Sequence, residues 1–225
     1  MSRMARAVAA GVPHLVTQRG NRRQPVFFGD DDYEVYKALL AEGCRAAGVA
    51  VWAYCLMPGH VHLILTPSDE DGLRAALGET HRRYTRLVNA REDWRGYLWQ
   101  GRFASFALDN KWLLAGARYV ELNPVRAKLT RRARDWRWSS ARAHLKGRDD
   151  GLVKVKPLLE RVDGWAAFLG EGLTEEEREA IRKGERTGRP LGAASFVKRL
   201  EKKLGRTLAR QKPGPKPKKK KTAKN

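Results

Sequence analysis

The stretch V-A-V-W-A-Y-C-L-M-P-G-H-V-H-L-I-L-T, residues 49–66, contains two strand-like runs joined by a short turn. β-Branched, aromatic and aliphatic residues dominate both runs, and such residues favour a pleated, half-buried strand. Met57-Pro58-Gly59 lies between them and supplies the Pro and Gly typical of tight turns. We therefore expect an antiparallel hairpin, with His60 and His62 on the same face of its second strand because side chains alternate.

The segments around this hairpin predict two further strands and three helices. Upstream, residues 13–17 form a β-branched run, and an amphipathic helix follows the candidate N-caps Asp30 and Asp31. Downstream, the pattern indicates a helix at 73–88, a strand at 99–108 and a helix at 111–123 that ends at Pro124. The order βαββαβα is that of a ferredoxin-like split βαβ fold, an α+β class with an antiparallel sheet. We expect helices on one face of this sheet and the other face free to bind a ligand.

The charge balance points to a polyanionic partner. The 225 residues include 46 Lys and Arg against 25 Asp and Glu, a formal net charge of +21. Residues 212–225 contribute seven of these charges, so the rest of the chain still carries +14. Such a field favours nucleic acid first and an anionic membrane second, and it is unusual for a metabolic enzyme. A hydrophobic content of 42% supports a real core, and the length suits one medium domain with appendages.

Several classes of protein are disfavoured by what the sequence lacks. The longest apolar run, residues 49–58, is far shorter than the ~20 residues of a membrane helix, and no charged-then-apolar leader opens the chain. Cys44 and Cys55 form no C-x-x-C pair, which argues against a cysteine zinc site and a disulfide framework. We expect a cytoplasmic, nucleoid-associated protein with no membrane partner and no small-molecule cofactor.

Two residue pairs could carry chemistry together. His60 and His62 could share one metal ion, although an isolated H-x-H on a polar strand face is more often a solvated pair. Tyr119 and Asn123 are four residues apart on the predicted helix before Pro124, so they share one face of it. The alternative for this second pair is a core tyrosine followed by a helix-capping Asn. The conjunction of both pairs favours a site that combines imidazoles, a phenol and an amide.

Four ordered stretches resemble the REP-associated tyrosine transposases, a single-tyrosine branch of the HUH single-strand DNA transposases. They are M-P-G-H-V-H-L-I-L at 57–65, L-W-Q-G-R-F at 98–103, R-Y-V-E-L-N-P-V-R-A at 118–127 and W-S-S-A-R-A-H at 138–144. G-R-P-L-G at 188–192 and the basic, Pro-rich end are also similar to this family. The resemblance spans about residues 12–145 and implies the HUH endonuclease fold.

The resemblance implies a metal-dependent endonuclease and strand transferase that acts on single-stranded DNA at palindromic hairpin repeats. Tyr119 would form a 5′-phosphotyrosine, and His60, His62 and Asn123 would hold Mg²⁺ or Mn²⁺ as a Lewis acid. A phenol has a pKa of ~10, so it needs nearby positive charge to react as phenolate. Tyr84 is the only rival nucleophile among the other tyrosines. The branch favours a monomer over a homodimer.

Arginines in several places are candidates for DNA contact, with solvated surface charge as the alternative. Guanidinium groups can meet phosphates with two hydrogen bonds, and arginines interleaved with tryptophans suit single strands whose bases stack on indole. We expect Trp138 to pack at the domain edge and His14 to be structural or to contact DNA. The candidates are Arg19, Arg22, Arg23, Arg102, Arg118, Arg131, Arg132, Arg134, Trp136 and Arg137.

We divide the chain into a catalytic domain at 1–145, a helical C-terminal extension at 146–211 and a disordered Lys/Pro-rich tail at 212–225. Residues 174–183 and 193–208 are predicted helices of the extension, the first with a capping signal at its start. The alternative function is a non-catalytic module that binds single-stranded nucleic acid on the same fold. A metallohydrolase built on H-x-H is disfavoured because position 64 is Ile and no Asp-His follows.

Overall fold

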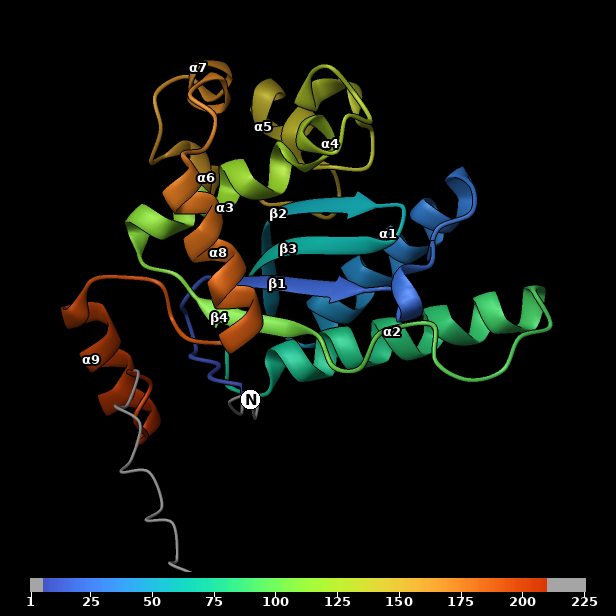
Figure 1. Cartoon of the computed structure of the whole chain (residues 1–225), viewed down its shortest axis with the longest axis horizontal. Helices are drawn as coiled ribbons and strands as arrows, with labels where there is room; N and C mark the ends of the chain where they lie inside the picture. The colour runs from blue at the N-terminus through green and yellow to red at the C-terminus, as the bar shows by residue number, and fades with distance from the viewer. Residues whose placement is uncertain (1–5, 210–225) are drawn as a thin grey trace, which may run out of the picture.

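A single antiparallel sheet organises the computed structural model, which describes residues 6–209 (Figure 1). Its strands are β1 (His14–Arg19), β2 (Val49–Met57), β3 (His60–Pro67) and β4 (Ala104–Ala107), in the spatial order β2-β3-β1-β4. Helices connect β1 to β2 and β3 to β4, which is the split βαβ arrangement and confirms the α+β class. The predicted tail at 212–225 lies outside the described residues. Within residues 6–209, no helix has the length and apolar character needed to cross a membrane.

The predicted hairpin is present, and its register places the histidine pair. β2 and β3 pair from Val49 opposite Pro67 to Met57 opposite His60. On its other side β3 pairs with β1, so that Thr17 lies opposite His62 and Arg19 lies opposite His60. Residues directly opposite one another point to the same face of a sheet. The register therefore gathers two histidines, a threonine and an arginine on one face.

Helices α1 (Asp30–Ala46) and α2 (Gly72–Arg91) cover one face of the sheet. The predicted caps Asp30 and Asp31 lie inside the first turn of α1, where carboxylates favour the helix dipole, and Gly29 is the N-cap. Tyr84 of α2 is buried in this layer and donates a 2.6 Å hydrogen bond to the carbonyl of Val26. Tyr84 is thus a core residue, which removes the rival to Tyr119.

The opposite face is not free, so that expectation was wrong. Helix α3 (Asn110–Glu121) packs on it, and the sheet residues Leu15, Ile64 and Phe106 are buried in the same cluster as Leu113 of the helix. The physical reason lies in the strands, because apolar residues occupy both of their faces and both faces must be buried. The histidine pair lies on the α3 face of the sheet, near the ends of β1 and β3.

The helix that carries Tyr119 ends earlier than predicted. Glu121 is the last residue of α3, Leu122 is its C-cap, and the short α4 (Asn123–Arg126) follows. Pro124 lies in the first turn of α4, and it has no N–H to donate to a carbonyl one turn earlier, so the helix cannot continue through it. Tyr119 and Asn123 therefore lie on two consecutive helices rather than on one face of a single helix.

Strand β4 is shorter than the predicted 99–108, because the segment before it leaves the regular ladder. The backbone N–H of Gln100 donates to the carbonyl of Arg19, and that of Asn21 donates to the carbonyl of Leu98, both at 2.8 Å. These bonds hold residues 98–100 beside the end of β1 without forming a strand. The sheet edge here is lined by an irregular loop.

The remaining elements within residues 6–209 are helices. The elements are η1 (Asn21–Arg23), η2 (Ala133–Asp135), α5 (Ala141–Lys146), α6 (Lys156–Leu159), α7 (Trp165–Gly170), α8 (Glu175–Thr187) and α9 (Ala194–Leu204). α8 begins with the predicted capping box, in which Thr174 and Glu177 bond each other's backbone N–H. It crosses the sheet near β4 (Figure 1), where a Cβ on Gly184 would lie 2.7 Å from the Phe106 ring. Glycine at this position allows the close approach of α8.

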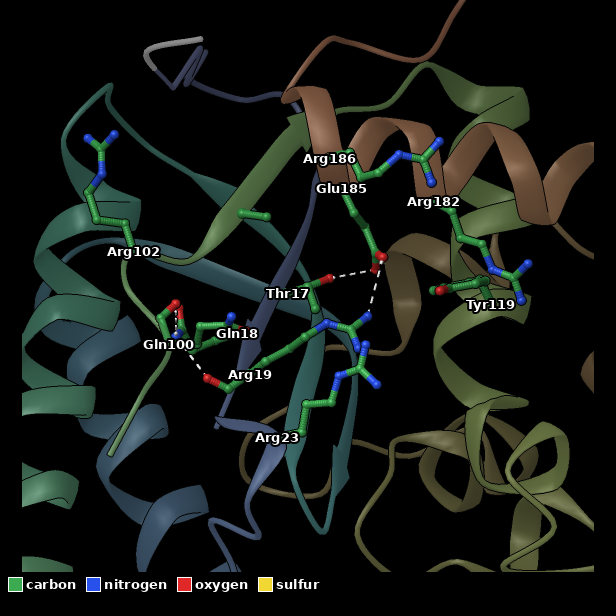
Figure 2. A pocket seen from close by; sticks show the side chains of 11 residues that line it. Thr17, Gln18, Arg19, Arg23, Gln100, Arg102, Tyr119, Arg182, Glu185 and Arg186 are labelled. Atoms are coloured by element: carbon green, nitrogen blue, oxygen red, sulfur yellow. Dashed lines mark hydrogen bonds and ion pairs between the residues drawn. The ribbon is translucent and has the colours of Figure 1, made fainter. Parts of the chain in front are cut away.

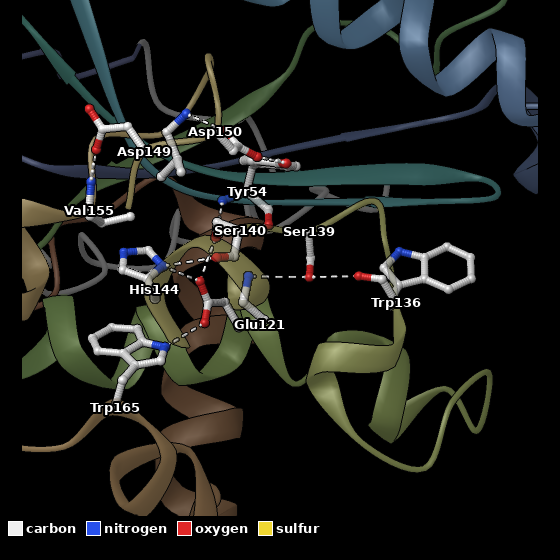
Figure 3. A network of polar contacts seen from close by, with 12 residues as sticks. Tyr54, Glu121, Trp136, Ser139, Ser140, His144, Asp149, Asp150, Val155 and Trp165 are labelled. Carbon is white, nitrogen blue, oxygen red and sulfur yellow. Dashed lines mark hydrogen bonds and ion pairs between the residues drawn. The ribbon is translucent and has the colours of Figure 1, made fainter. Parts of the chain in front are cut away.

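A buried carboxylate ties the end of α3 to the extension (Figure 3). Glu121 is fully buried and accepts hydrogen bonds from the Ser140 hydroxyl, from His144 Nδ1 at 2.6 Å and from the Trp165 indole at 2.8 Å. A buried charge is tolerated only when it is paired and hydrogen-bonded, and this one is. The network fixes the turn of helix that follows Tyr119.

Candidate functional site

A cavity of about 670 Å³ opens beside the end of β1, and we call it the charged cavity (Figure 2). It lies between β1, the loop before β4, α3 and α8. Five of its eleven lining residues are arginines, and one is a glutamate. The lining residues are Thr17, Gln18, Arg19, Arg23, Gln100, Arg102, Ala104, Tyr119, Arg182, Glu185 and Arg186. A concave surface with this excess of guanidinium groups suits a phosphate backbone.

The histidine pair lies against this cavity with a defined proton arrangement. The rings of His60 and His62 are perpendicular, with centroids 4.9 Å apart. Thr17 donates its hydroxyl proton to Glu185 at 2.9 Å, and Thr17 Oγ1 lies 3.2 Å from His62 Nδ1. Because the threonine has one proton and gives it to the carboxylate, its oxygen must accept from His62 Nδ1–H. His62 Nε2 therefore keeps its lone pair, as in metal sites where a carboxylate orients the ligating histidine.

Both histidines are neutral in the free protein. Burial, with Arg19 and Arg126 nearby, lowers the pKa of His60 to about 4. Burial lowers the pKa of His62 further, with added repulsion from His60 and the same two arginines. Neutral imidazole is the form that binds a metal ion.

Tyr119 joins the histidine pair from α3. Its ring meets that of His62 edge to face with centroids 5.4 Å apart, and Arg126 Cζ lies 4.3 Å from its centroid on the ring face. Figure 2 shows its hydroxyl directed into the cavity towards Glu185. Burial and Glu185 raise the pKa of Tyr119, whereas Arg126, Arg19 and Arg182 oppose the rise. The phenol is thus protonated at rest and surrounded by the cations that could stabilise a phenolate.

Asn123, the third predicted metal ligand, lies at the start of α4. Asn123 is buried, and its Nδ2 has no hydrogen-bond partner. The oxygen and nitrogen of a side-chain amide can be exchanged by rotating the group, so the atom without a partner can equally be the oxygen, which is a metal ligand. Among residues 6–209 no group of three or more His, Cys, Asp and Glu is placed to hold a metal. The contact between the rings of His60 and His62 brings two candidate metal ligands together, and the amide of Asn123 is a third candidate donor.

The arginines predicted to bind DNA divide into two groups. Arg19, Arg23 and Arg102 line the charged cavity, and Arg22 is exposed in the adjoining η1. Arg118 is not brought to the cavity, because its guanidinium pairs with Glu171 and Glu177 and lies over the Phe168 ring, although it adjoins Tyr119 in sequence.

The Arg-rich segment at 131–137 does not line the charged cavity either. Arg132 pairs with Asp135, and Arg137 pairs with Asp30 and Glu34 of α1. Trp136 donates its indole N–H to the carbonyl of Leu56 and packs edge to face on Tyr33, so its ring is engaged within the protein. Arg131 and Arg134 are exposed.

Sequence reasoning missed several residues of the site. Arg182, Glu185 and Arg186 come from α8, and their spacing of three and four residues puts them on one helix face. This spacing can be read from the sequence. The contact between Glu185 and Thr17 of β1 cannot, because the two residues are 168 positions apart. Arg126 was not among the predicted site residues, although Arg118 was. The break at Leu122 turns α4 so that Arg126 alone folds back over the ring.

Comparison with known proteins identifies the family. The model of the family described as IS200-like transposase matches residues 8–123, which is just over half of the chain. A search of the curated proteins found no match.

Two solved structures are similar to the chain. One is a REP-associated tyrosine transposase bound to a REP hairpin, with 23% identity, coverage of 68% of this chain and 92% of that chain, and a TM-score of 0.57. Another is a putative transposase from Deinococcus radiodurans R1, with 20% identity, coverage of 57% and 92%, and a TM-score of 0.38. The first likeness supports the fold, and the family match agrees with the motifs around His60 and Tyr119. This chain belongs to the IS200-like transposase family.

Proposed function

We propose that this transposase is a metal-dependent enzyme that nicks and rejoins single-stranded DNA, with Tyr119 as its nucleophile. One observation carries the proposal. The Tyr119 ring lies against the ring of His62, which in turn contacts that of His60, and Tyr119 lines a cavity that five arginines also line. Nucleophile, metal ligands and phosphate-binding groups are the three components that such a reaction needs.

The chemical step is a transesterification at phosphorus. The phenolic oxygen of Tyr119 forms a bond to phosphorus while the bond from phosphorus to the 3′ oxygen breaks. The products are a 5′-phosphotyrosine and a 3′-hydroxyl, which takes up a proton as the phenol loses one. The bond energy is retained in the phosphotyrosine, so a second 3′-hydroxyl can reverse the step and join a new strand.

The residues of the site have separate roles in this step. A divalent ion held by His60, His62 and Asn123 would supply Lewis-acid stabilisation of the charge on the phosphate. Arg126, over the ring face, stabilises the phenolate that forms on Tyr119. The arginines of the charged cavity hold the neighbouring phosphates in position.

The partner that we propose is a DNA hairpin with a single-stranded flank. The solved relative is bound to a REP hairpin, and the five arginines of the charged cavity suit a phosphate backbone. We propose a monomer that acts in the cytoplasm on the nucleoid.

The test is a covalent-adduct assay on denaturing gels with labelled hairpin DNA that carries single-stranded flanks, in Mn²⁺ or Mg²⁺. The parent should form a protein–DNA adduct that EDTA abolishes. Tyr119→Phe should form none while it still binds DNA, and Tyr84→Phe, which removes a buried hydroxyl outside the cavity, should keep adduct formation. Adduct formation by Tyr119→Phe at the parental rate would overturn the assignment.

A second readout is independent of cleavage. Mn²⁺ binding to the DNA-free protein, followed by electron paramagnetic resonance, should be about 10- to 100-fold weaker in His60→Ala, since loss of a ligand or of its support costs that much or more. Equal Mn²⁺ affinity in parent and variant would remove the histidine pair from the metal site. DNA binding without any adduct in the parent would favour the non-catalytic module.

A further inference from the structure

Glu121, the last residue of α3, carries a carboxylate that stability alone does not explain. Its side chain is fully buried, and desolvation penalises a buried charge. A negative charge at the C-terminal end of a helix is also opposed by the helix dipole. None of the steps proposed for nicking uses this residue, although it lies two positions after Tyr119. The contacts of the carboxylate therefore indicate its role.

Three donors from separate parts of the chain converge on this carboxylate (Figure 3). Its Oε1 accepts from the Ser140 hydroxyl at the start of α5 and from His144 Nδ1 within α5, the latter at 2.6 Å. Its Oε2 accepts from the indole N–H of Trp165, the first residue of α7, at 2.8 Å. The Trp165 ring also stacks on that of His144, with centroids 4.3 Å apart. A buried polar network in which both oxygens are bonded is rigid.

Ser140 connects this network to the strand beside the histidine pair. Its hydroxyl accepts from the backbone N–H of Tyr54 at 3.0 Å, and its own backbone N–H donates to the Tyr54 carbonyl at 2.9 Å. Tyr54 belongs to β2, and the next residue of that strand, Cys55, lies opposite His62 in the ladder with β3. Hydrogen bonds therefore run from the histidine strand through β2 and Ser140 to the helix that carries Tyr119.

The end of α3 sets the position of the Tyr119 hydroxyl. The Tyr119 ring meets that of His62 edge to face, with centroids 5.4 Å apart, and only two rotatable bonds link a tyrosine ring to its backbone. A shift of this turn is therefore carried to the hydroxyl, and a misplacement of ~1 Å can cost on the order of 100-fold in rate. Before the tyrosine, Arg118 pairs with Glu177 of α8 at 3.0 Å. Residues on both sides of Tyr119 are thus bonded to the extension.

We propose that Glu121 is a positioning residue for strand transfer. Its carboxylate fixes the last turn of α3 relative to β2, so that the Tyr119 hydroxyl stays beside the histidine pair. Glu121 acts through the helix, and it contributes to the rate of nicking rather than to DNA affinity. The proposal rests on the proposed nicking function, and it is tested by one readout that needs that function and one that does not.

Two substitutions weaken the network in the full-length protein. Glu121→Gln leaves a single acceptor oxygen for donors that approach both sides of the group, and Trp165→Phe removes the indole donor. Tyr54→Phe is the matched control, because the Tyr54 hydroxyl donates to a different carboxylate, that of Asp150. This control leaves the backbone bonds between Tyr54 and Ser140 in place.

The first readout separates rate from binding. Single-turnover adduct formation should slow about 10- to 100-fold in Glu121→Gln and in Trp165→Phe, because the nucleophile is misplaced. DNA affinity, measured by fluorescence anisotropy in EDTA so that no strand is cut, should keep the parental value in both variants, which also shows that they are folded. Tyr54→Phe should match the parent in rate and affinity. Parental rates in both network variants, or losses of affinity as large as the losses of rate, would overturn the positioning role.

The second readout is ¹⁹F NMR of the DNA-free protein with 3-fluorotyrosine at position 119. The parent defines the signal of the anchored ring, and Tyr54→Phe should reproduce it. Glu121→Gln and Trp165→Phe should broaden that signal or add a second one as the ring takes up other positions. Parental spectra in both network variants would overturn the proposal, even if the parent forms its covalent adduct. Changed spectra in a protein whose parent forms no adduct would support the anchoring of Tyr119 and overturn the nicking function.

Discussion

The sheet with α3 and α4, and the extension at 146–209, contribute different things to the charged cavity. The sheet side supplies the proposed nucleophile Tyr119 and the proposed metal ligands His60 and His62, all within the segment that matches the family. The extension supplies charge through α8, whose Arg186 and Glu185 face the cavity. The proposed reactive groups therefore come from short sequence motifs, whereas charged groups around them come from a helix that is distant in sequence.

A second difference lies in how arginines are used. In the Arg-rich segment at 131–137, two of the four arginines pair with acids of the same protein, Arg132 with Asp135 and Arg137 with Asp30 and Glu34. Arg186 lines the cavity, and no ion pair is recorded for it among residues 6–209. The number of arginines in a segment therefore says less about DNA contact than the acids that surround them.

The largest effect should come from the sheet side. Arg126→Met removes the cation over the Tyr119 ring and should slow adduct formation about 100-fold in single-turnover assays, the typical cost of one preorganised electrostatic contact. The pKa of Tyr119 should rise further, because Arg126 opposes the rise caused by burial. An unchanged rate would mean that α8, rather than Arg126, stabilises the phenolate. The contrast between the sheet side and the extension would then be wrong.

A steric change tests whether α8 belongs to the site. Gly184→Val places side-chain atoms against Phe106 and should lift α8 from β4, since overpacking costs ~1–3 kcal/mol. Amide hydrogen exchange in α8 should accelerate roughly 5- to 100-fold while that of β3 stays unchanged. Gly170→Val is the control, because a Cβ there meets nothing within 4 Å. Equal exchange of α8 in both variants would show that the contact does not hold the helix.

The two uses of arginine are compared by matched substitutions. Arg186→Gln should weaken binding of single-stranded DNA about 3- to 10-fold and reduce the salt slope by ~0.7, the value for one phosphate contact. Arg137→Gln removes the same charge from an exposed position and should change affinity less than twofold. Equal losses would mean that net charge, rather than position, sets affinity. Both are measured by anisotropy over a range of salt concentrations.

The smallest effect should come from Glu185. Glu185→Gln removes a negative charge from the cavity, so DNA affinity should rise about 2- to 3-fold, and the pKa of Tyr119 should fall because Glu185 raises it. Ultraviolet titration, with Tyr119→Phe as the reference, measures the phenol. A raised pKa in Glu185→Gln would show that the carboxylate is not the neighbour that the phenol senses.

The sequence predicted the parts of this site that depend on local patterns. Alternation in 49–66 placed the two histidines on one face, and helical spacing placed Tyr119 on a helix, whereas the family resemblance joined them in one site. The sequence placed Asn123 on the same helix as Tyr119 because it put the end of that helix at Pro124. The helix ends earlier, at Glu121, and Asn123 begins the next one. The expectation of a free sheet face was wrong because apolar residues such as Leu15 and Ile64 also occupy the second face of the strands and require a cover. The contact of α8 with β1 depends on tertiary packing and has no local signature.

The bond between Thr17 and Glu185 also has a consequence in time. Its partners are separated by 168 residues, and a ribosome adds roughly 5–20 residues per second. About 8 to 34 seconds therefore pass between the synthesis of Thr17 and that of the carboxylate that fixes the proton on His62. During that interval the nascent chain acquires its histidine pair and its tyrosine, but the wall of the cavity that α8 forms does not yet exist. Translation itself delays the completion of this site.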